Sequence, residues 1–167
     1  MKRTRMLLGR LPKVLTIDDK GRLVIPALLR KEIEKEGGGQ DLHLGCLEKG
    51  YLYLHTEKQH REFVDALSEV LDNTRKSRET RRKILYRFVP VSLDSAGRIL
   101  VPKDLKEAAG IERDVIILFM NERIEIMPAD KAVDLAEDDE SFDDALEDVF
   151  AEIGARPRAR GSDQGNE

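Results

Sequence analysis

The stretch DDKGRLVIP at residues 18–26 returns 76 positions later as DSAGRILVP at residues 94–102. Asp, Gly, Arg and Pro recur at the same places without a gap, and three apolar residues separate Arg from Pro in both copies. The likeness extends outward to Leu15-Thr16-Ile17 before the first copy and Val91-Ser92-Leu93 before the second. Internal repeats indicate duplicated structural units. The chain therefore carries two structurally equivalent sites.

Each copy predicts a strand, a tight turn, a second strand and a helix. Gly21 and Gly97 suit a turn position with positive φ, which costs a residue with a Cβ about 1 kcal/mol or more. Pro26 and Pro102 suit the first position of a helix, where the missing N–H is not needed. A β hairpin around each glycine, followed by a helix, is the expected local structure.

A second hairpin is predicted after each helix, in residues 42–54 and in residues 115–126. Each half of the chain is thus expected to read hairpin, helix, hairpin. Hairpins with unpaired edges are unstable alone. The two halves are therefore predicted to interlock into one β core, which gives an α+β fold with connecting helices.

The remaining segments show helical spacing of apolar residues, at residues 56–71, 80–88 and 129–136. A further amphipathic helix, acidic on one side, is expected to begin at a Ser141 cap, and residues 155–167 are expected to be disordered. The predicted organisation is a first half at residues 9–72, a basic connecting helix at 73–89, a second half at 90–136, and an acidic helix with its tail at 137–167.

The net charge of −4 conceals two opposite parts. Residues 130–167 have a balance of −9, and the remaining 129 residues have a balance of +5. Seven Lys and Arg residues fall between positions 75 and 87, where Glu79 is the one acid. A basic body with an acidic tail is typical of a protein that binds a polyanion and whose own acidic tail competes for the basic surface. Charge alone equally fits a solvated surface.

In both copies an arginine directly follows the turn glycine, where a stiff backbone would hold it at the rim of the hairpin. An aspartate four residues earlier can orient the guanidinium through a bidentate pair and leave its other donors free. Such an arginine reads guanine edges or phosphates. The candidate site residues are Arg22 and Arg98, with Asp18 and Asp94 as their orienting carboxylates. The alternative is a local ion pair inside a structural building block.

The two sites are not expected to be equally strong. Lys20 adds a positive charge beside Arg22, whereas Ala96 occupies the same place in the second copy.

Residues 16–30, TIDDKGRLVIPALLR, closely resemble the signature of MraZ proteins, members of the AbrB-like swapped-hairpin superfamily. That family carries two copies of a motif in which three residues separate Asp from Arg. Residues 51–54 and 115–126 are similar to the family as well, and the resemblance covers about residues 9–136. The motif is specific because it occurs twice.

The resemblance implies two AbrB-like halves and a bacterial transcriptional regulator of the division and cell-wall gene cluster. Such a protein would bind direct repeats in double-stranded DNA upstream of its own operon as a homo-oligomeric ring. Arg22 and Arg98 would be the main DNA contacts, and Lys20 would assist at the phosphates. A cytoplasmic, nucleoid-associated protein is expected.

Two other functions stay open at this stage. An AbrB-type antitoxin usually has one motif copy and a toxin-binding tail, and an oligomeric scaffold would bind protein alone. The acidic helix likewise has two interpretations, as a cap packed on the body or as a competitor of DNA.

The sequence contains no catalytic constellation, so an enzyme is not expected. His43, His55 and His60 lack metal-ligand spacing on one element, and packing or surface roles are predicted, without a metal or other cofactor. Cys46 is the single cysteine, which excludes an intrachain disulfide and fits a reducing compartment. It is expected to pack as a small hydrophobe. The apolar run at residues 6–8 is too short for a signal peptide or a membrane span.

Overall fold

The computed structural model describes residues 8–37, 39–137 and 139–155. Two compact units divide the chain between residues 132 and 133, within helix α5 (Lys131–Ala136). The first unit holds every strand of the described residues, and the second holds the acidic helix α6 (Glu140–Ala155). Of residues 155–167, which were predicted to be disordered, Ala155 is instead the last residue of α6, and residues 156–167 lie outside the described residues.

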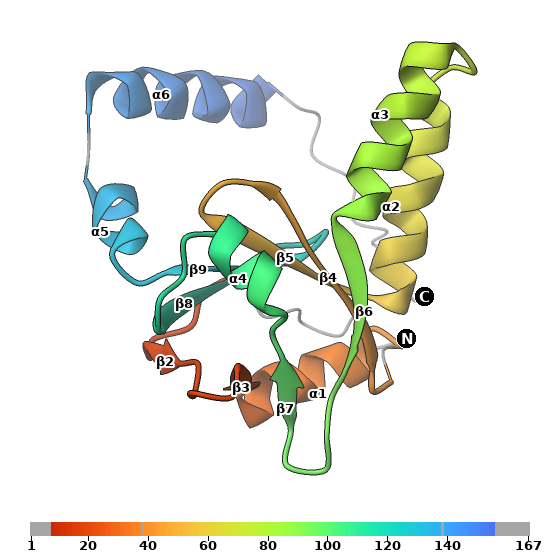
Figure 1. Cartoon of the computed structure of the whole chain (residues 1–167). Helices are drawn as coiled ribbons and strands as arrows, with labels where there is room; N and C mark the ends of the chain where they lie inside the picture. Colours follow the sequence, from red (N-terminus) through yellow and green to blue (C-terminus); the bar gives the residue numbers. More distant parts are fainter. Residues whose placement is uncertain (1–7, 38, 138, 156–167) are drawn as a thin grey trace, which may run out of the picture. The chain divides into compact units, whose positions relative to one another are not determined.

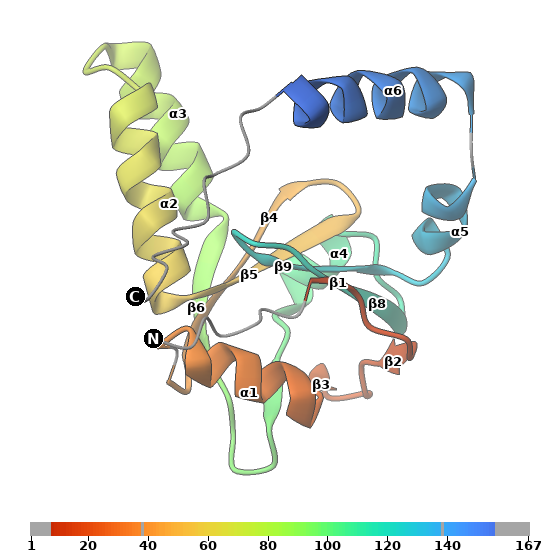
Figure 2. The same cartoon turned by 180° about the vertical axis from the view of Figure 1, so that it is seen from behind.

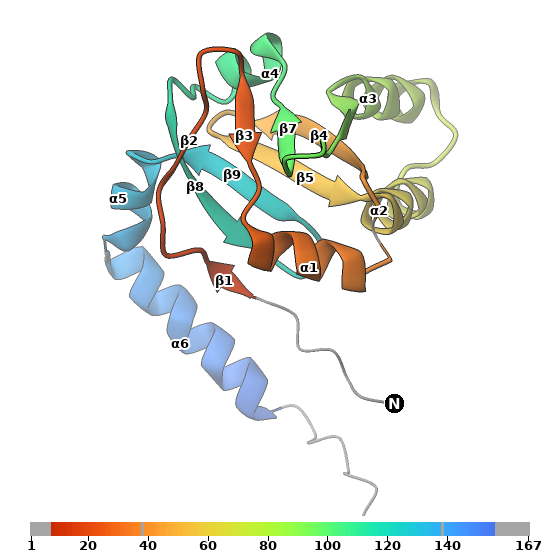
Figure 3. The same ribbon diagram turned by 90° about the horizontal axis from the view of Figure 1, so that it is seen from below.

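The two repeat copies meet in a two-stranded antiparallel ribbon. Strand β3 (Arg22–Val24) comes from the first copy and β7 (Arg98–Leu100) from the second, and Leu23 lies opposite Ile99. Figure 3 shows the two strands side by side. The turn before each strand is present, but the expected pairing of its two flanking strands is wrong, because each strand finds its partner in the other half of the chain.

The same exchange builds the larger sheet, whose order is β1-β8-β9-β5-β4-β6, with β2 also paired to β8. Strand β2 of the first half pairs with the hairpin of the second half, and β6 of the second half pairs with the hairpin of the first. The strands span Gly9–Arg10 (β1), Leu15–Thr16 (β2), Asp41–Glu48 (β4), Tyr51–Thr56 (β5), Phe88–Ser92 (β6), Asp114–Phe119 (β8) and Ile124–Pro128 (β9).

Equivalent side-chain hydrogen bonds join the strands that the two halves exchange. The hydroxyl of Thr16 donates to Asp114 Oδ1, and the hydroxyl of Ser92 donates to Asp41 Oδ1, each at 3.0 Å. Thr16 and Ser92 hold the same position in the two repeat copies. The predicted α+β fold, with two halves interlocked into one β core, is confirmed.

One hydrophobic core lies between the ribbon, the sheet and two short helices, α1 (Ala27–Lys35) and α4 (Lys103–Ala108). Cys46 lies in it, as expected of a small hydrophobe. Figure 2 shows α1 at the same end of the unit as the ribbon. Both halves supply residues to the core, and its fully buried members include Leu23, Ile25, Leu29, Ile33, Leu42, Leu44, Ile99, Ile117 and Ile126.

Both short helices begin one residue later than predicted. Pro26 and Pro102 have ψ of 146° and 141°, which is extended backbone, so each proline is the N-cap and not the first helical residue. The proline ring still fixes φ at the point where the chain turns from strand to helix.

A pair of helices, α2 (Glu57–Val70) and α3 (Arg75–Tyr86), extends away from the sheet at the end opposite to the ribbon (Figures 1 and 2). Thr56 forms a capping box with Gln59, which fixes the start of α2 close to the predicted position. The second helix starts earlier than expected because Thr74 caps it. Phe88 was predicted to be helical but lies in β6, paired with Gly45 of β4.

Helix α6 starts at Glu140, so the predicted Ser141 cap is wrong. The carboxylate of Asp139 accepts the N–H of Phe142 at 2.8 Å and caps the helix in its place. Among the described residues, no helix is both long and apolar enough to cross a membrane.

Candidate nucleic-acid interface

The two repeat turns have the same backbone geometry. In the first, the N–H of Gly21 donates to the Asp18 carbonyl at 2.9 Å, and the N–H of Asp18 donates to the Arg22 carbonyl at 3.0 Å. The second turn repeats these contacts at 3.0 and 2.8 Å. Gly21 and Gly97 have φ of 80° and 73°, so the predicted need for glycine is confirmed.

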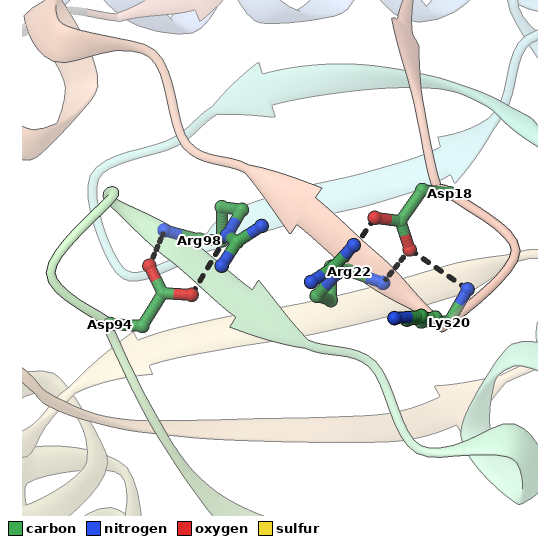
Figure 4. Close-up of polar contacts among 5 residues, drawn as sticks. All are labelled: Asp18, Lys20, Arg22, Asp94 and Arg98. Carbon is green, nitrogen blue, oxygen red and sulfur yellow. Dashed lines mark hydrogen bonds and ion pairs between the residues drawn. The ribbon is translucent and has the colours of Figure 1, made fainter.

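Each motif aspartate binds its arginine at two points. Asp18 Oδ1 accepts the backbone N–H of Lys20 at 3.0 Å and that of Arg22 at 2.9 Å, while Oδ2 accepts Arg22 Nε at 2.7 Å. Asp94 makes the equivalent contacts, with its Oδ2 at 2.8 Å from Arg98 Nε. Figure 4 shows both pairs, each at its own end of the ribbon.

This geometry differs from the predicted bidentate pair. One carboxylate oxygen holds the turn, and the other holds the guanidinium through Nε alone. Within the described part of the chain, the two terminal nitrogens of Arg22 and of Arg98 make no hydrogen bond. The guanidinium is therefore fixed in direction with its terminal donors available to a ligand.

The hydrogen bonds also keep the aspartates ionised. The pKa of Asp18 lies below its ordinary value of 3.8, chiefly because the backbone N–H of Arg22 donates to the carboxylate. The pKa of Asp94 is lowered in the same way by the backbone N–H of Arg98. Both ion pairs are thus intact at neutral pH, and they are lost as the pH falls below 3.8 through the lowered values.

Both arginines lie on the outer face of the ribbon. Side chains alternate along a strand, so burying Leu23 and Ile99 turns the residues on either side of them outward. Arg22 lies opposite Leu100, and Arg98 lies opposite Val24, so the two arginines occupy diagonal positions. Diagonal partners in an antiparallel pair lie about 7–8 Å apart. The ribbon thus presents two oriented guanidinium groups close together.

The surroundings of the two arginines are not identical. Lys20 is exposed at the Asp18 end of the ribbon, and Ala96 takes its place at the other end. Arg30 of α1, which the sequence identified only as part of the repeat, packs its guanidinium against the second turn, where a Cβ on Gly97 would collide with it. Its Nε is buried without a hydrogen-bond partner.

The basic cluster of residues 75–87 does not join this surface. It lies on and just after α3, at the opposite end of the unit from the ribbon (Figure 1). Several of its arginines bind nearby groups: Arg78 donates to the Asn73 carbonyl at 2.6 Å, and Arg82 pairs with Glu79 at 3.4 Å. The cluster is a separate basic surface.

Three histidines that looked unrelated in sequence lie together. His43 of β4 stacks on His60 of α2 with ring centroids 4.0 Å apart, and the Nδ1 atoms of His55 and His60 are 3.1 Å apart. Phe63 and Phe88 complete the cluster. Burial lowers the pKa of His55 and of His60 to about 4. These are packing histidines, and no group of three or more potential metal ligands occurs among the residues that the structure describes.

The chain is similar to known proteins over most of its length. Residues 88–152 match the family model described as "MraZ protein, putative antitoxin-like". The chain is 31% identical over 140 residues to a protein of Mycoplasmoides gallisepticum named transcriptional regulator MraZ, a match that spans 82% of this chain and 88% of that protein. A protein of the same name from Bifidobacterium longum is 30% identical over 138 residues, with 82% and 89% covered.

A third protein with this name, from Xanthomonas oryzae pv. oryzae, is 28% identical over 113 residues, which are 67% of this chain and 76% of that protein. Two of these relatives are at least 30% identical to the chain over more than four fifths of both sequences, and the chain therefore belongs to the MraZ family.

Proposed function

We propose that this protein is a transcriptional regulator that binds double-stranded DNA in a sequence-specific manner. The observation that carries the proposal is the pair of oriented guanidinium groups, Arg22 and Arg98, on the outer face of one ribbon. The names of the similar proteins describe transcriptional regulators, which supports the same class of function. The names of these similar proteins include no enzymatic activity.

The ribbon suits the major groove of B-form DNA. The groove is about 12 Å wide and admits a two-stranded ribbon, whose strands are about 4.8 Å apart. Arginine can donate two hydrogen bonds to the O6 and N7 acceptors of guanine, and each such contact contributes about 1–3 kcal/mol of discrimination. Arg22 and Arg98 are the proposed base-reading residues, and Asp18 and Asp94 position them.

Lys20 is the proposed phosphate contact. It is exposed near Arg22, and its own backbone N–H donates a hydrogen bond to the Asp18 carboxylate. Phosphate contacts supply affinity that falls with salt but little sequence information. The first copy should therefore bind more tightly than the second, while both read bases.

We further propose that the protein acts as a homo-oligomeric ring on direct repeats upstream of its own operon, in the division and cell-wall gene cluster. A ring of subunits, each with one ribbon, would engage successive repeats and gain affinity through effective concentration. We accordingly propose that the protein acts in the cytoplasm, in association with the nucleoid.

A footprint of the full-length protein on the DNA upstream of its own gene tests the proposal, together with sizing of the free and bound protein. Protection of spaced direct repeats is expected. The double variant Arg22→Ala/Arg98→Ala should lose that protection, whereas Arg82→Ala, an exposed arginine on α3, should keep it. Equal protection by the double variant would refute the assignment, and absence of any DNA binding at low salt would indicate a protein-binding scaffold.

A second candidate is an antitoxin. Helix α6 supports it, because Phe142, Val149, Phe150 and Ile153 are all exposed on an otherwise acidic helix. The family description also contains the word antitoxin-like. A toxin gene beside this one would favour the antitoxin, and cell-wall synthesis genes would favour the regulator.

A further inference from the structure

The outer face of the ribbon carries two aliphatic side chains beside its two arginines. Val24 is 51% exposed and Leu100 is 59% exposed, although each immediately follows a core residue that is fully buried. Both are therefore outside the hydrophobic core. A polar strand former such as Thr would suit a solvent-facing strand position as well. Their side chains give the face that carries the two arginines an apolar surface, which can contact an apolar group of a ligand.

Both repeat copies have an aliphatic residue at this position. Val24 and Leu100 each stand two residues after the motif arginine. Leu28 is exposed to a similar degree, but Asp104 takes its place in the second copy. The repeat therefore keeps an aliphatic side chain on the arginine-bearing face and does not keep one at the neighbouring exposed site.

The register places each aliphatic side chain directly opposite an arginine of the other copy. Val24 pairs with Arg98, and Leu100 pairs with Arg22. Directly opposite residues in an antiparallel pair have Cα atoms about 4.5–5.5 Å apart. Successive base pairs are about 3.4 Å apart along the DNA axis. An arginine and the aliphatic residue opposite it can therefore contact two neighbouring bases.

The one apolar group that unmodified DNA exposes in the major groove is the 5-methyl of thymine. We infer that Val24 and Leu100 contact thymine methyl groups adjacent to the bases that Arg98 and Arg22 read. This inference rests on the proposed function and adds two specificity-determining residues to it. Each half of the bound site should then contain a thymine next to a guanine.

The test begins with duplexes selected from a randomised library by the full-length wild-type protein. Each thymine of a selected duplex is then replaced singly by deoxyuridine, which removes only the 5-methyl group, and affinity is measured by fluorescence anisotropy at fixed salt. Loss of one buried methyl should weaken binding about three- to fourfold at each contacted thymine. The variant Val24→Ala should be insensitive at one of these positions, and Leu100→Ala at the other.

Val70→Ala is the matched control, because Val70 is exposed on α2 and far from the ribbon, and this variant should keep the full sensitivity. If wild-type protein binds every deoxyuridine duplex as tightly as its thymine parent, the inference is wrong while DNA binding stands. The same conclusion holds if Val24→Ala changes only the oligomeric mass, because the residue then packs against another copy of the chain. Failure to select any duplex would instead refute the proposed function.

Discussion

Replacing Asp18 by Asn separates orientation from charge at the first motif. Asparagine keeps an oxygen that can accept the backbone N–H groups of Lys20 and Arg22, so the turn is preserved. Its other group is an NH2, which cannot accept from Arg22 Nε, so the 2.7 Å contact is lost. The substitution therefore frees the guanidinium and at the same time removes a negative charge near the proposed DNA surface.

The two effects have opposite signs. Ordering a free arginine side chain costs up to about 2 kcal/mol, which corresponds to a factor of about 30 in affinity. Because Arg22 is already partly buried, a loss of about five- to twentyfold on the specific site is expected. Removing the negative charge should strengthen binding to unrelated DNA. Specific affinity should fall while non-specific affinity rises.

Anisotropy titrations on a selected duplex and on a scrambled duplex, at matched salt, measure both quantities. The variant Arg22→Ala is the control, because adding Asp18→Asn to it should cause no further loss of specific binding. A thermal melt confirms that the turn still supports the fold. Tighter binding of Asp18→Asn to both duplexes would refute the positioning role, because it would mean that the aspartate acts only as an unfavourable charge.

Three further predictions concern Lys20, helix α6 and the histidine cluster. Lys20→Ala should reduce the slope of log affinity against log salt concentration by about 0.9 per bound site. The exchange variant Lys20→Ala/Ala96→Lys should restore the slope. An unchanged slope in Lys20→Ala would show that this side chain contacts no phosphate. Ending the chain after Ala136 removes the six acids of α6 and should tighten DNA binding about tenfold at low salt. Unchanged affinity at matched salt would mean that α6 does not compete with DNA and only packs. Lowering the pH from 6.5 towards 4 should destabilise the fold, because His55 and His60 bind protons in the unfolded chain at a higher pH than in the folded one. His55 alone should contribute on the order of 3 kcal/mol to the loss of stability. A denaturation midpoint that stays constant over this pH range would contradict the prediction.

Local chemistry allowed many elements to be predicted from the sequence. The turn glycines, the strand-to-helix change at Pro26 and Pro102, and the start of α2 near Thr56 all depend on residues within a few positions of one another. Helix caps depend on more than the type of residue. Ser141 and Asp139 both have side chains that can cap a helix, and only the backbone position decides between them.

The choice of strand partners could not be predicted in the same way. Strand β3 prefers β7 over the strand beside it in sequence, because the exchange buries Leu23 against Ile99 and joins the two hairpins through shared sheet edges. The histidine cluster has the same origin, since His43, His55 and His60 come from three different elements. The sequence therefore predicts the contact of each arginine with its aspartate, but the face that the two arginines share follows from the exchange of strands.

Duplication within one chain also gives the ribbon a direction. A dimer of single-copy chains has two identical ends, which suits a palindromic site. Here Lys20 stands at one end and Ala96 at the other, and the Arg30 guanidinium packs on Gly97, whereas a Cβ at Gly21 would meet the Val101 carbonyl at 3.1 Å. A ribbon with distinct ends binds a non-palindromic site in one orientation. Subunits placed in the same sense around a ring would then each need the same site in the same orientation, which is the arrangement of a direct repeat.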